Sequence, residues 1–107
     1  MLNAQVDWRS DIYAMGVLLY EMLTGTSPFK ADSVYATMTK RLKTDPTPPS
    51  KLRKNCPTEL DKIVERAMQR DPELRYQSAL EMGQDLVQIN DALGFEGKFL
   101  EIGRAHV

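Results

Sequence analysis

The chain has 107 residues, enough for one small domain built around a single hydrophobic core. Lys and Arg together number 14 and Asp and Glu 15, and this near-balance excludes a globally basic nucleic-acid-binding protein. A single cysteine and a single histidine exclude an internal disulfide framework and a multi-cysteine zinc site, while 42% hydrophobic residues argue against disorder.

No segment has the features of an export signal or a membrane span. The first residues lack a basic stretch followed by an apolar one. The most apolar segment, Ile12 to Leu23, contains Glu21 and is shorter than the ~20 residues that a spanning helix needs. We therefore expect a cytoplasmic chain with no membrane segment.

Four patterns of apolar residues predict an all-α fold with four principal helices and no substantial sheet. The first helix covers about residues 11–24, with Ser10 or Asp11 as N-cap and Gly25 just beyond its end. Its apolar residues point in almost every direction around the helix axis. We therefore expect it to be the central and most buried helix.

The second predicted helix covers about residues 33–42, with Asp32 as N-cap. A thin apolar stripe marks one face of it: Val34, Met38 and Leu42. The following segment, residues 43–56, holds three prolines, which remove amide donors and fix φ. We expect no regular element there.

The third predicted helix covers about residues 57–70 and has one apolar face. The fourth opens with a capping box, in which Ser78 and Glu81 each satisfy a free backbone amide, and it ends at Gly94. These single-faced patterns are typical of helices that pack against a buried one.

Site chemistry needs convergent titratable groups, a metal-ligand set or a phosphate-binding loop, and the sequence has no such pattern. Ser10 and Ser78 have no histidine nearby in the sequence and are interpreted as helix caps. Cys56 precedes a proline at a helix start but has no base partner, so we interpret it as structural. His106 is interpreted as a residue of the tail.

A basic stretch runs from Lys40 to Lys54, with six cations against one carboxylate, Asp45. It could contact phosphate or an acidic partner. It lacks the interleaved aromatic residues that stack on bases, so a solvated face and loop is the favoured interpretation, and we expect no nucleic-acid partner.

Asp11 differs from the other carboxylates because it opens the helix that is expected to be buried. A buried carboxylate needs hydrogen-bond donors. The sequence names no specific donor for it.

Two segments of the sequence form extended motifs. Residues 7–25 read DWRSDIYAMGVLLYEMLTG and are followed by Pro28 and Phe29, and residues 66–76 read RAMQRDPELRY. The first segment is similar to the central helix of the large lobe (C-lobe) in the protein kinase family, and the second resembles the late D-P-x-x-R segment of that family. The resemblance covers about residues 7–93 and is to bacterial-type serine/threonine kinases. It implies the helical subdomain of the C-lobe.

The resemblance also implies roles for four residues. Asp11 would accept hydrogen bonds from the backbone of the catalytic loop, which would supply the donors missing above. Leu18 and Met22 would support the column of side chains beneath the adenine ring. Arg75 would form an ion pair with the glutamate of the Ala-Pro-Glu motif that ends the activation segment. Each role supports catalysis without performing a chemical step.

The motifs that perform kinase chemistry are not in the sequence. They are the Gly-rich loop, the β3 lysine, the catalytic-loop Asp and Asn, and the Asp-Phe-Gly aspartate, which together position ATP and Mg²⁺. We therefore expect residues 1–93 to be a partial kinase domain that begins at an internal methionine. Its parent would contain the N-lobe and catalytic loop and phosphorylate protein Ser or Thr, whereas the chain alone would be inactive. The alternative is a free-standing helical protein-interaction module.

The C-terminal residues 94–107 are expected to be a tail. Within it, residues 101–107 resemble the in-frame translation of a sequencing-library adapter. We therefore expect those residues not to be native.

Overall fold

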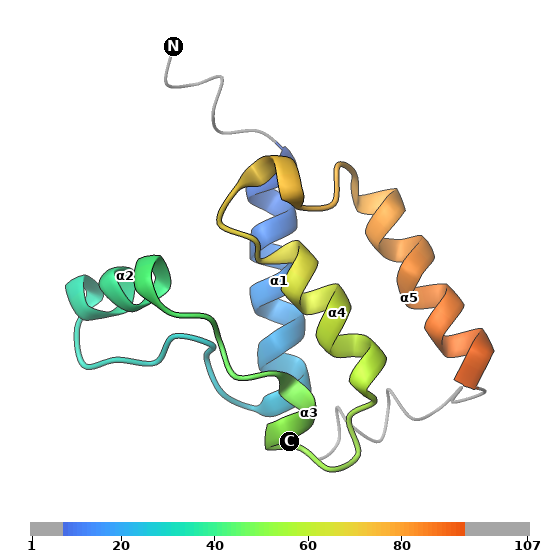
Figure 1. Cartoon of the computed structure of the whole chain (residues 1–107), viewed down its shortest axis with the longest axis horizontal. Coiled ribbons are helices and arrows are strands. Elements are labelled where there is room, and N and C mark those ends of the chain that lie inside the picture. Colours follow the sequence, from blue (N-terminus) through green and yellow to red (C-terminus); the bar gives the residue numbers. More distant parts are fainter. Residues whose placement is uncertain (1–7, 94–107) are drawn as a thin grey trace.

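The computed structural model describes residues 8–93, in which every regular element is helical (Figure 1). The elements are α1 (Trp8–Thr24), α2 (Val34–Lys43), α3 (Pro49–Leu52), α4 (Thr58–Ala67), the 3-10 turn η2 (Pro72–Leu74) and α5 (Ala79–Leu93). The predicted all-α class and the four principal helices are confirmed. No helix of this part of the chain combines the length and apolar character that a membrane span requires.

Gly25 ends α1 where the sequence predicts, whereas the helix begins earlier than predicted. Gly25 adopts φ 77°, which a residue with a side chain reaches only at a cost, and its amide donates to Glu21 O at 2.8 Å. The predicted stop is therefore confirmed. The helix begins three residues earlier than predicted, so Ser10 and Asp11 lie within its first turn, and the prediction that one of them is the N-cap is wrong.

The caps of α2 and α5 differ slightly from the predicted ones. Ser33 rather than Asp32 caps α2, accepting from the Ala36 amide at 3.0 Å. At α5 the Ser78 hydroxyl accepts from the Glu81 amide at 3.1 Å, as predicted. The Glu81 carboxylate, however, accepts from the amide of Gln77 at 2.9 Å, one residue before the expected donor.

The proline-rich segment contains α3, so the prediction that no regular element crosses it is wrong. Pro49 stands at the first helical position, where a missing amide costs nothing and a fixed φ favours the helix. The amide of Arg53 donates to Pro49 O at 3.0 Å and closes the turn.

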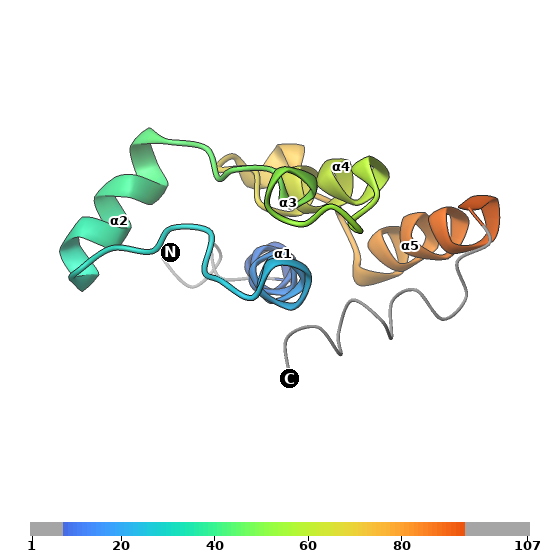
Figure 2. The ribbon, with the colours of Figure 1, turned by 90° about the horizontal axis from the view of Figure 1, so that it is seen from below.

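The core lies where α1 and α4 pack together, with α3 and α5 against α4 (Figures 1 and 2). A Cβ at Gly16 would stand 2.8 Å from Ala67 Cβ and 2.8 Å from Met68 Cγ, so the absence of a side chain lets the helices approach closely. The residues buried in this core include Ile12, Tyr20, Leu23, Leu60, Ile63, Val64, Ala67, Tyr76 and Met82.

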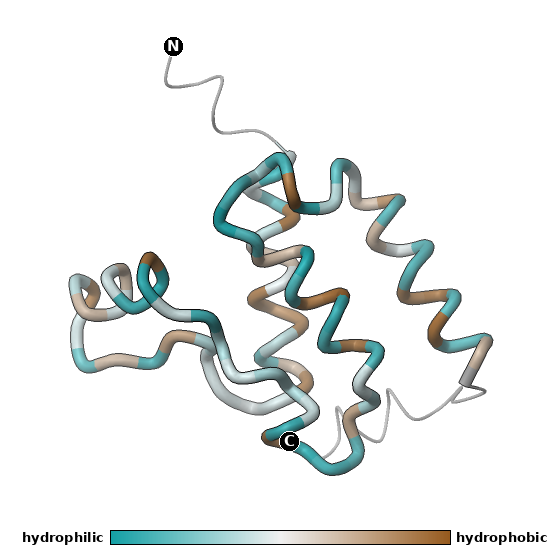
Figure 3. The backbone as a smooth tube through the Cα atoms, viewed as in Figure 1, coloured by the Kyte–Doolittle hydropathy of each residue, from teal (hydrophilic) through white to brown (hydrophobic). Residues whose placement is uncertain are grey.

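The opposite side of α1 is exposed, so the prediction of a helix buried on every side is wrong for this chain. Leu18 and Met22 are 57% and 55% exposed, and Met15 also faces solvent. The physical reason is that α3 and α4 cover only one side of α1. Along the tube coloured by hydropathy, apolar positions recur along the length of α1 (Figure 3).

Candidate functional site

Three of the four predicted site residues share the exposed face of α1. Asp11, Leu18 and Met22 are spaced by seven and four residues, which places them in one stripe along a helix. All three are exposed, so the expectation that Asp11 is buried is wrong. We call Asp11, Met15, Leu18 and Met22 the outer stripe. It joins a carboxylate at the helix start to three apolar side chains.

Arg75 lies apart from the outer stripe, on the buried side of α1. Its side chain is 6% exposed and follows η2. The guanidinium donates to Gln69 O at 2.6 Å, to Arg9 O at 2.9 Å and to Arg70 O at 3.2 Å. It also lies 4.8 Å from the centroid of the Tyr13 ring. Backbone carbonyls of the chain therefore hold the Arg75 guanidinium in place.

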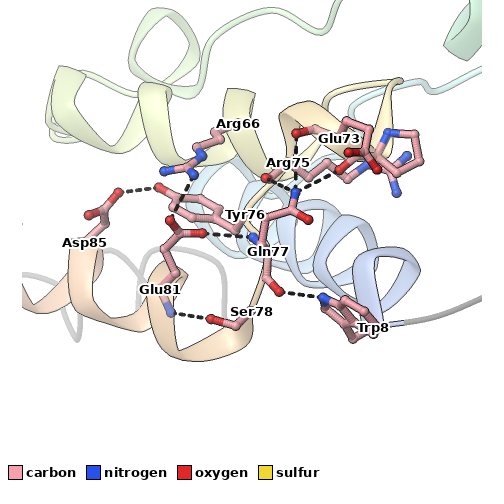
Figure 4. A network of polar contacts seen from close by, with 10 residues as sticks. Trp8, Arg66, Glu73, Arg75, Tyr76, Gln77, Ser78, Glu81 and Asp85 are labelled. Atoms are coloured by element: carbon pink, nitrogen blue, oxygen red, sulfur yellow. Dashed lines mark hydrogen bonds and ion pairs between the residues drawn. The ribbon is translucent and has the colours of Figure 1, made fainter.

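The segment around Arg75 joins the start of α1 to the start of α5 (Figure 4). The Trp8 indole donates to Gln77 O, and Arg9 pairs with Glu73. The Gln77 side-chain amide donates to Arg75 O at 2.8 Å and to Pro72 O at 3.1 Å. These contacts fix the loop that carries Arg75.

A second polar cluster lies beside this loop and was not predicted from the sequence. The buried Tyr76 hydroxyl donates to Asp85 at 2.7 Å, and Arg66 lies 4.2 Å from the Tyr76 ring (Figure 4). Arg66 also pairs with Glu81 at 3.1 Å. Burial, followed by the hydrogen bond to Asp85, raises the pKa of Tyr76, so the phenol stays neutral.

A cavity of about 410 Å³ opens between α1, α4 and the loop after α2. Tyr13, Tyr20 and Phe29 contribute aromatic walls, and the Tyr20 hydroxyl donates to Thr47 O at 2.7 Å. Burial and then the charge of Asp61 raise the pKa of Tyr20. No sequence motif signals this cavity, because its walls come from distant segments.

Two of the three candidates for nucleophilic chemistry are explained by the fold, Cys56 by burial and Ser78 by helix capping. Cys56 is buried, and burial followed by the charge of Asp61 raises the pKa of its thiol to about 11, which disfavours the reactive thiolate. Ser78 caps α5, whereas Ser10 is exposed within α1. His106 lies outside the described residues.

The basic stretch is partly used to support the fold. Arg53 donates through Nε and Nη2 to Thr24 O, at 3.1 and 2.9 Å, and so caps the end of α1. The Arg41 guanidinium lies 4.0 Å from the Tyr13 ring centroid. Lys51 and Lys54 are exposed, in line with a solvated face.

Within residues 8–93, no three His, Cys, Asp or Glu side chains gather closely enough to hold a metal ion. The described residues offer an uncovered helix face and a firmly bonded Arg75 loop.

Comparison with known proteins supplies the context for these features. The model of the protein kinase domain matches residues 2–86. The chain is 43% identical over 86 residues to serine/threonine-protein kinase PknB of Mycolicibacterium smegmatis, and likewise 43% identical to PknB of Mycobacterium tuberculosis. A probable serine/threonine-protein kinase of Clostridium perfringens is 40% identical over 83 residues.

These matches cover 78–80% of this chain but only 12–14% of the length of the relatives. The chain thus spans a small part of the proteins that it matches. The match nevertheless includes the outer stripe and the Arg75 loop. The chain belongs to the protein kinase domain family.

Proposed function

We propose that this chain is the helical scaffold of a serine/threonine protein kinase C-lobe, whose parent transfers the γ-phosphoryl group of ATP to protein Ser or Thr. The observation that carries the proposal is the 43% identity to serine/threonine kinases over 80% of the chain. The exposed outer stripe supports it, because a scaffold helix needs an open face on which catalytic segments can rest.

In this proposal the outer stripe receives the catalytic loop. The Asp11 carboxylate stands at the helix start, where it can accept backbone amides of a segment laid across α1. Leu18 and Met22 provide apolar contacts further along the same face and support the side chains beneath the adenine ring. The three residues position catalytic groups and take no part in bond making.

Arg75 has a related supporting role in the proposal. Three backbone carbonyls fix its guanidinium. The side chain would therefore lose little conformational entropy when it binds a carboxylate. A glutamate of the activation segment would then meet a preformed cation. ATP and Mg²⁺ would be held by the N-lobe and catalytic loop of the parent, and the isolated chain would not transfer phosphate.

The test has two parts. The purified chain, incubated with Mg²⁺ and ATP, is expected to show no ATP hydrolysis and no phosphorylation of a protein substrate. In the second part, residues 2–86 of this chain replace the matching segment of PknB from M. smegmatis. The resulting chimera is expected to phosphorylate the substrates of PknB. A chimera that folds by circular dichroism but is inactive would contradict the proposal.

An Asp11→Asn change in the chimera probes the positioning role. We expect kcat to fall while KM for ATP changes little, because the carboxylate would orient the catalytic loop without touching the nucleotide. An unchanged kcat would show that Asp11 has no such role. Ser10→Ala, on the same exposed turn, is the matched control.

A further inference from the structure

The cavity between α1, α4 and the loop after α2 is not used in the proposed scaffold role. Its volume of about 410 Å³ lies within the range of about 300–1,000 Å³ that is typical of small-molecule sites. The aromatic rings of Tyr13, Tyr20 and Phe29 line it, and all three side chains are buried. We call this space the inner cavity. It has the size and the apolar wall that a small organic ligand needs.

One face of α4 also lines the inner cavity. Its members lie three, four, seven and eight positions after the first, so they share one side of the helix: Asp61, Val64, Glu65, Met68 and Gln69. Val64 and Met68 are buried, whereas Asp61 is half-buried and Glu65 is exposed. This face therefore joins an apolar floor to an acidic rim.

The inner cavity carries a negative charge. Its ionisable lining consists of four carboxylates and two guanidiniums, which give a net charge of −2: Asp45, Asp61, Glu65, Asp71, Arg41 and Arg70. Both guanidiniums are already engaged, because Arg70 pairs with Asp45 at 3.2 Å and Arg41 lies 4.0 Å from the centroid of the Tyr13 ring. No cation within the described part of the chain pairs with Glu65.

Two of the other carboxylates are held by uncharged donors. Asp61 accepts from the amide of Ser50 at 2.9 Å and from the Ser50 hydroxyl, and Asp71 accepts from the amide of Glu73 at 2.9 Å. These donors fix the carboxylates in place without neutralising them. The charge of Asp61, after burial, also raises the pKa of Tyr20, so its negative charge acts on the inner wall of the cavity.

We propose that the inner cavity binds a small organic ammonium compound with a flat apolar or aromatic body. Arg41 already covers the Tyr13 ring, which leaves Tyr20 and Phe29 to contact the body of the ligand. The ammonium group would lie at the acidic rim beside Glu65. A nucleotide or another polyanion fits less well, because the acidic lining would repel it. The inference does not depend on the proposed kinase function.

The test uses the full chain and two probes, tryptamine and indole-3-propionate, which share an indole ring and carry opposite charges. Amide resonances of the chain are followed by NMR during titration with each probe. Tryptamine is expected to shift the resonances of Tyr20, Thr47 and Glu65 with a dissociation constant of about 1 mM or lower. Indole-3-propionate is expected to bind about tenfold more weakly.

A pair of variants tests the acidic rim. Glu65→Gln is expected to lower the affinity for tryptamine about fivefold, the size of effect that an exposed ion pair typically gives. Glu59→Gln is the matched control, because it removes the same charge from an exposed position of α4 that does not line the inner cavity. It should bind tryptamine as the original chain does.

Several results would overturn the proposal. Equal affinity for the two probes, or no shift with tryptamine at about 5 mM, would do so without any variant. Shifts confined to the outer stripe of α1 would place the probe on a different surface. A Glu65→Gln variant that binds tryptamine as well as the original chain, or a Glu59→Gln variant that is equally weakened, would remove the role of the acidic rim.

Discussion

At the scale of single residues, the sequence predicts roles that depend on the local backbone better than it predicts burial or contacts with distant residues. Gly25 and Ser78 were predictable because a local backbone rule decides their role. Asp11 was predicted to be buried because the pattern of its helix is apolar on all sides, yet it is exposed, since burial depends on what packs against that side. The aromatic partners of Arg41 and Arg75 could not be predicted, because Tyr13 meets them only after folding.

The exposure of Asp11 leads to a prediction for the isolated chain. Asp11→Asn is expected to change the free energy of unfolding by less than about 0.5 kcal/mol, as surface substitutions usually do. Urea denaturation of the two proteins measures the difference. A loss well above that value would show that the carboxylate has an important partner within this chain.

Gly16 gives a prediction of the opposite kind. Gly16→Ala places a Cβ 2.8 Å from Ala67 Cβ, which cannot rotate away, so a loss of about 1–3 kcal/mol is expected from overpacking. Gly83→Ala is the matched control, because no atom lies within 4 Å of its new Cβ. The control is expected to gain up to about 1 kcal/mol from helix propensity. If urea denaturation gave the same change in the free energy of unfolding for Gly16→Ala and Gly83→Ala, the close approach of α1 and α4 would be contradicted.

At the scale of elements, periodicity predicted the helices, and local chemistry decided their ends. The four long helices are all where the apolar patterns indicated, although α1 starts earlier than expected. The short helix α3 was missed because prolines were interpreted only as breakers, whereas Pro49 begins a turn. The outer stripe follows from helical spacing alone, but the cavity beside Tyr20 required the folded arrangement.

The buried groups around α4 and α5 predict how stability responds to alkaline pH. Folding raises the pKa of Tyr76 above its usual 10.0 and that of Cys56 from 9.0 to about 11, so the folded chain keeps protons that the unfolded chain loses. The contribution of these two groups to the free energy of unfolding is therefore fully present below pH 9, and it is expected to be lost progressively as the pH rises above that value. Urea midpoints measured between pH 8 and pH 11 test this, and Cys56→Ala is expected to reduce the slope between pH 9 and pH 11. A flat profile would contradict the burial of both groups.

At the scale of the whole molecule, the described chain has a core on one side of α1 and an open apolar face on the other. The sequence indicated the open face only indirectly. A helix that is apolar on all sides is typically packed against other segments on all sides, and residues 8–93 cover only one side of α1. An open face of this kind favours association between molecules. The parent kinase of our proposal would supply the missing cover.

We therefore expect the isolated chain to self-associate through the outer stripe and to be only marginally stable. Leu18→Lys/Met22→Lys is expected to shift it toward the monomer in sedimentation velocity runs at increasing concentration. Leu80→Lys, which alters an exposed leucine of α5, is the control and should leave association unchanged. A chain that is monomeric at every concentration and unfolds in a sharp two-state transition would indicate a domain in its own right.

The hydrogen bond from Arg75 to Arg9 O joins residues 66 positions apart, and the bond from Trp8 to Gln77 O joins residues 69 apart. The start of α1 is thus secured by residues that the ribosome adds much later. Until they emerge, the nascent α1 keeps its apolar side chains accessible, and the closing of so long a loop is entropically costly. Chaperones that hold apolar segments during synthesis would therefore meet this helix before the rest of the chain can cover its inner side.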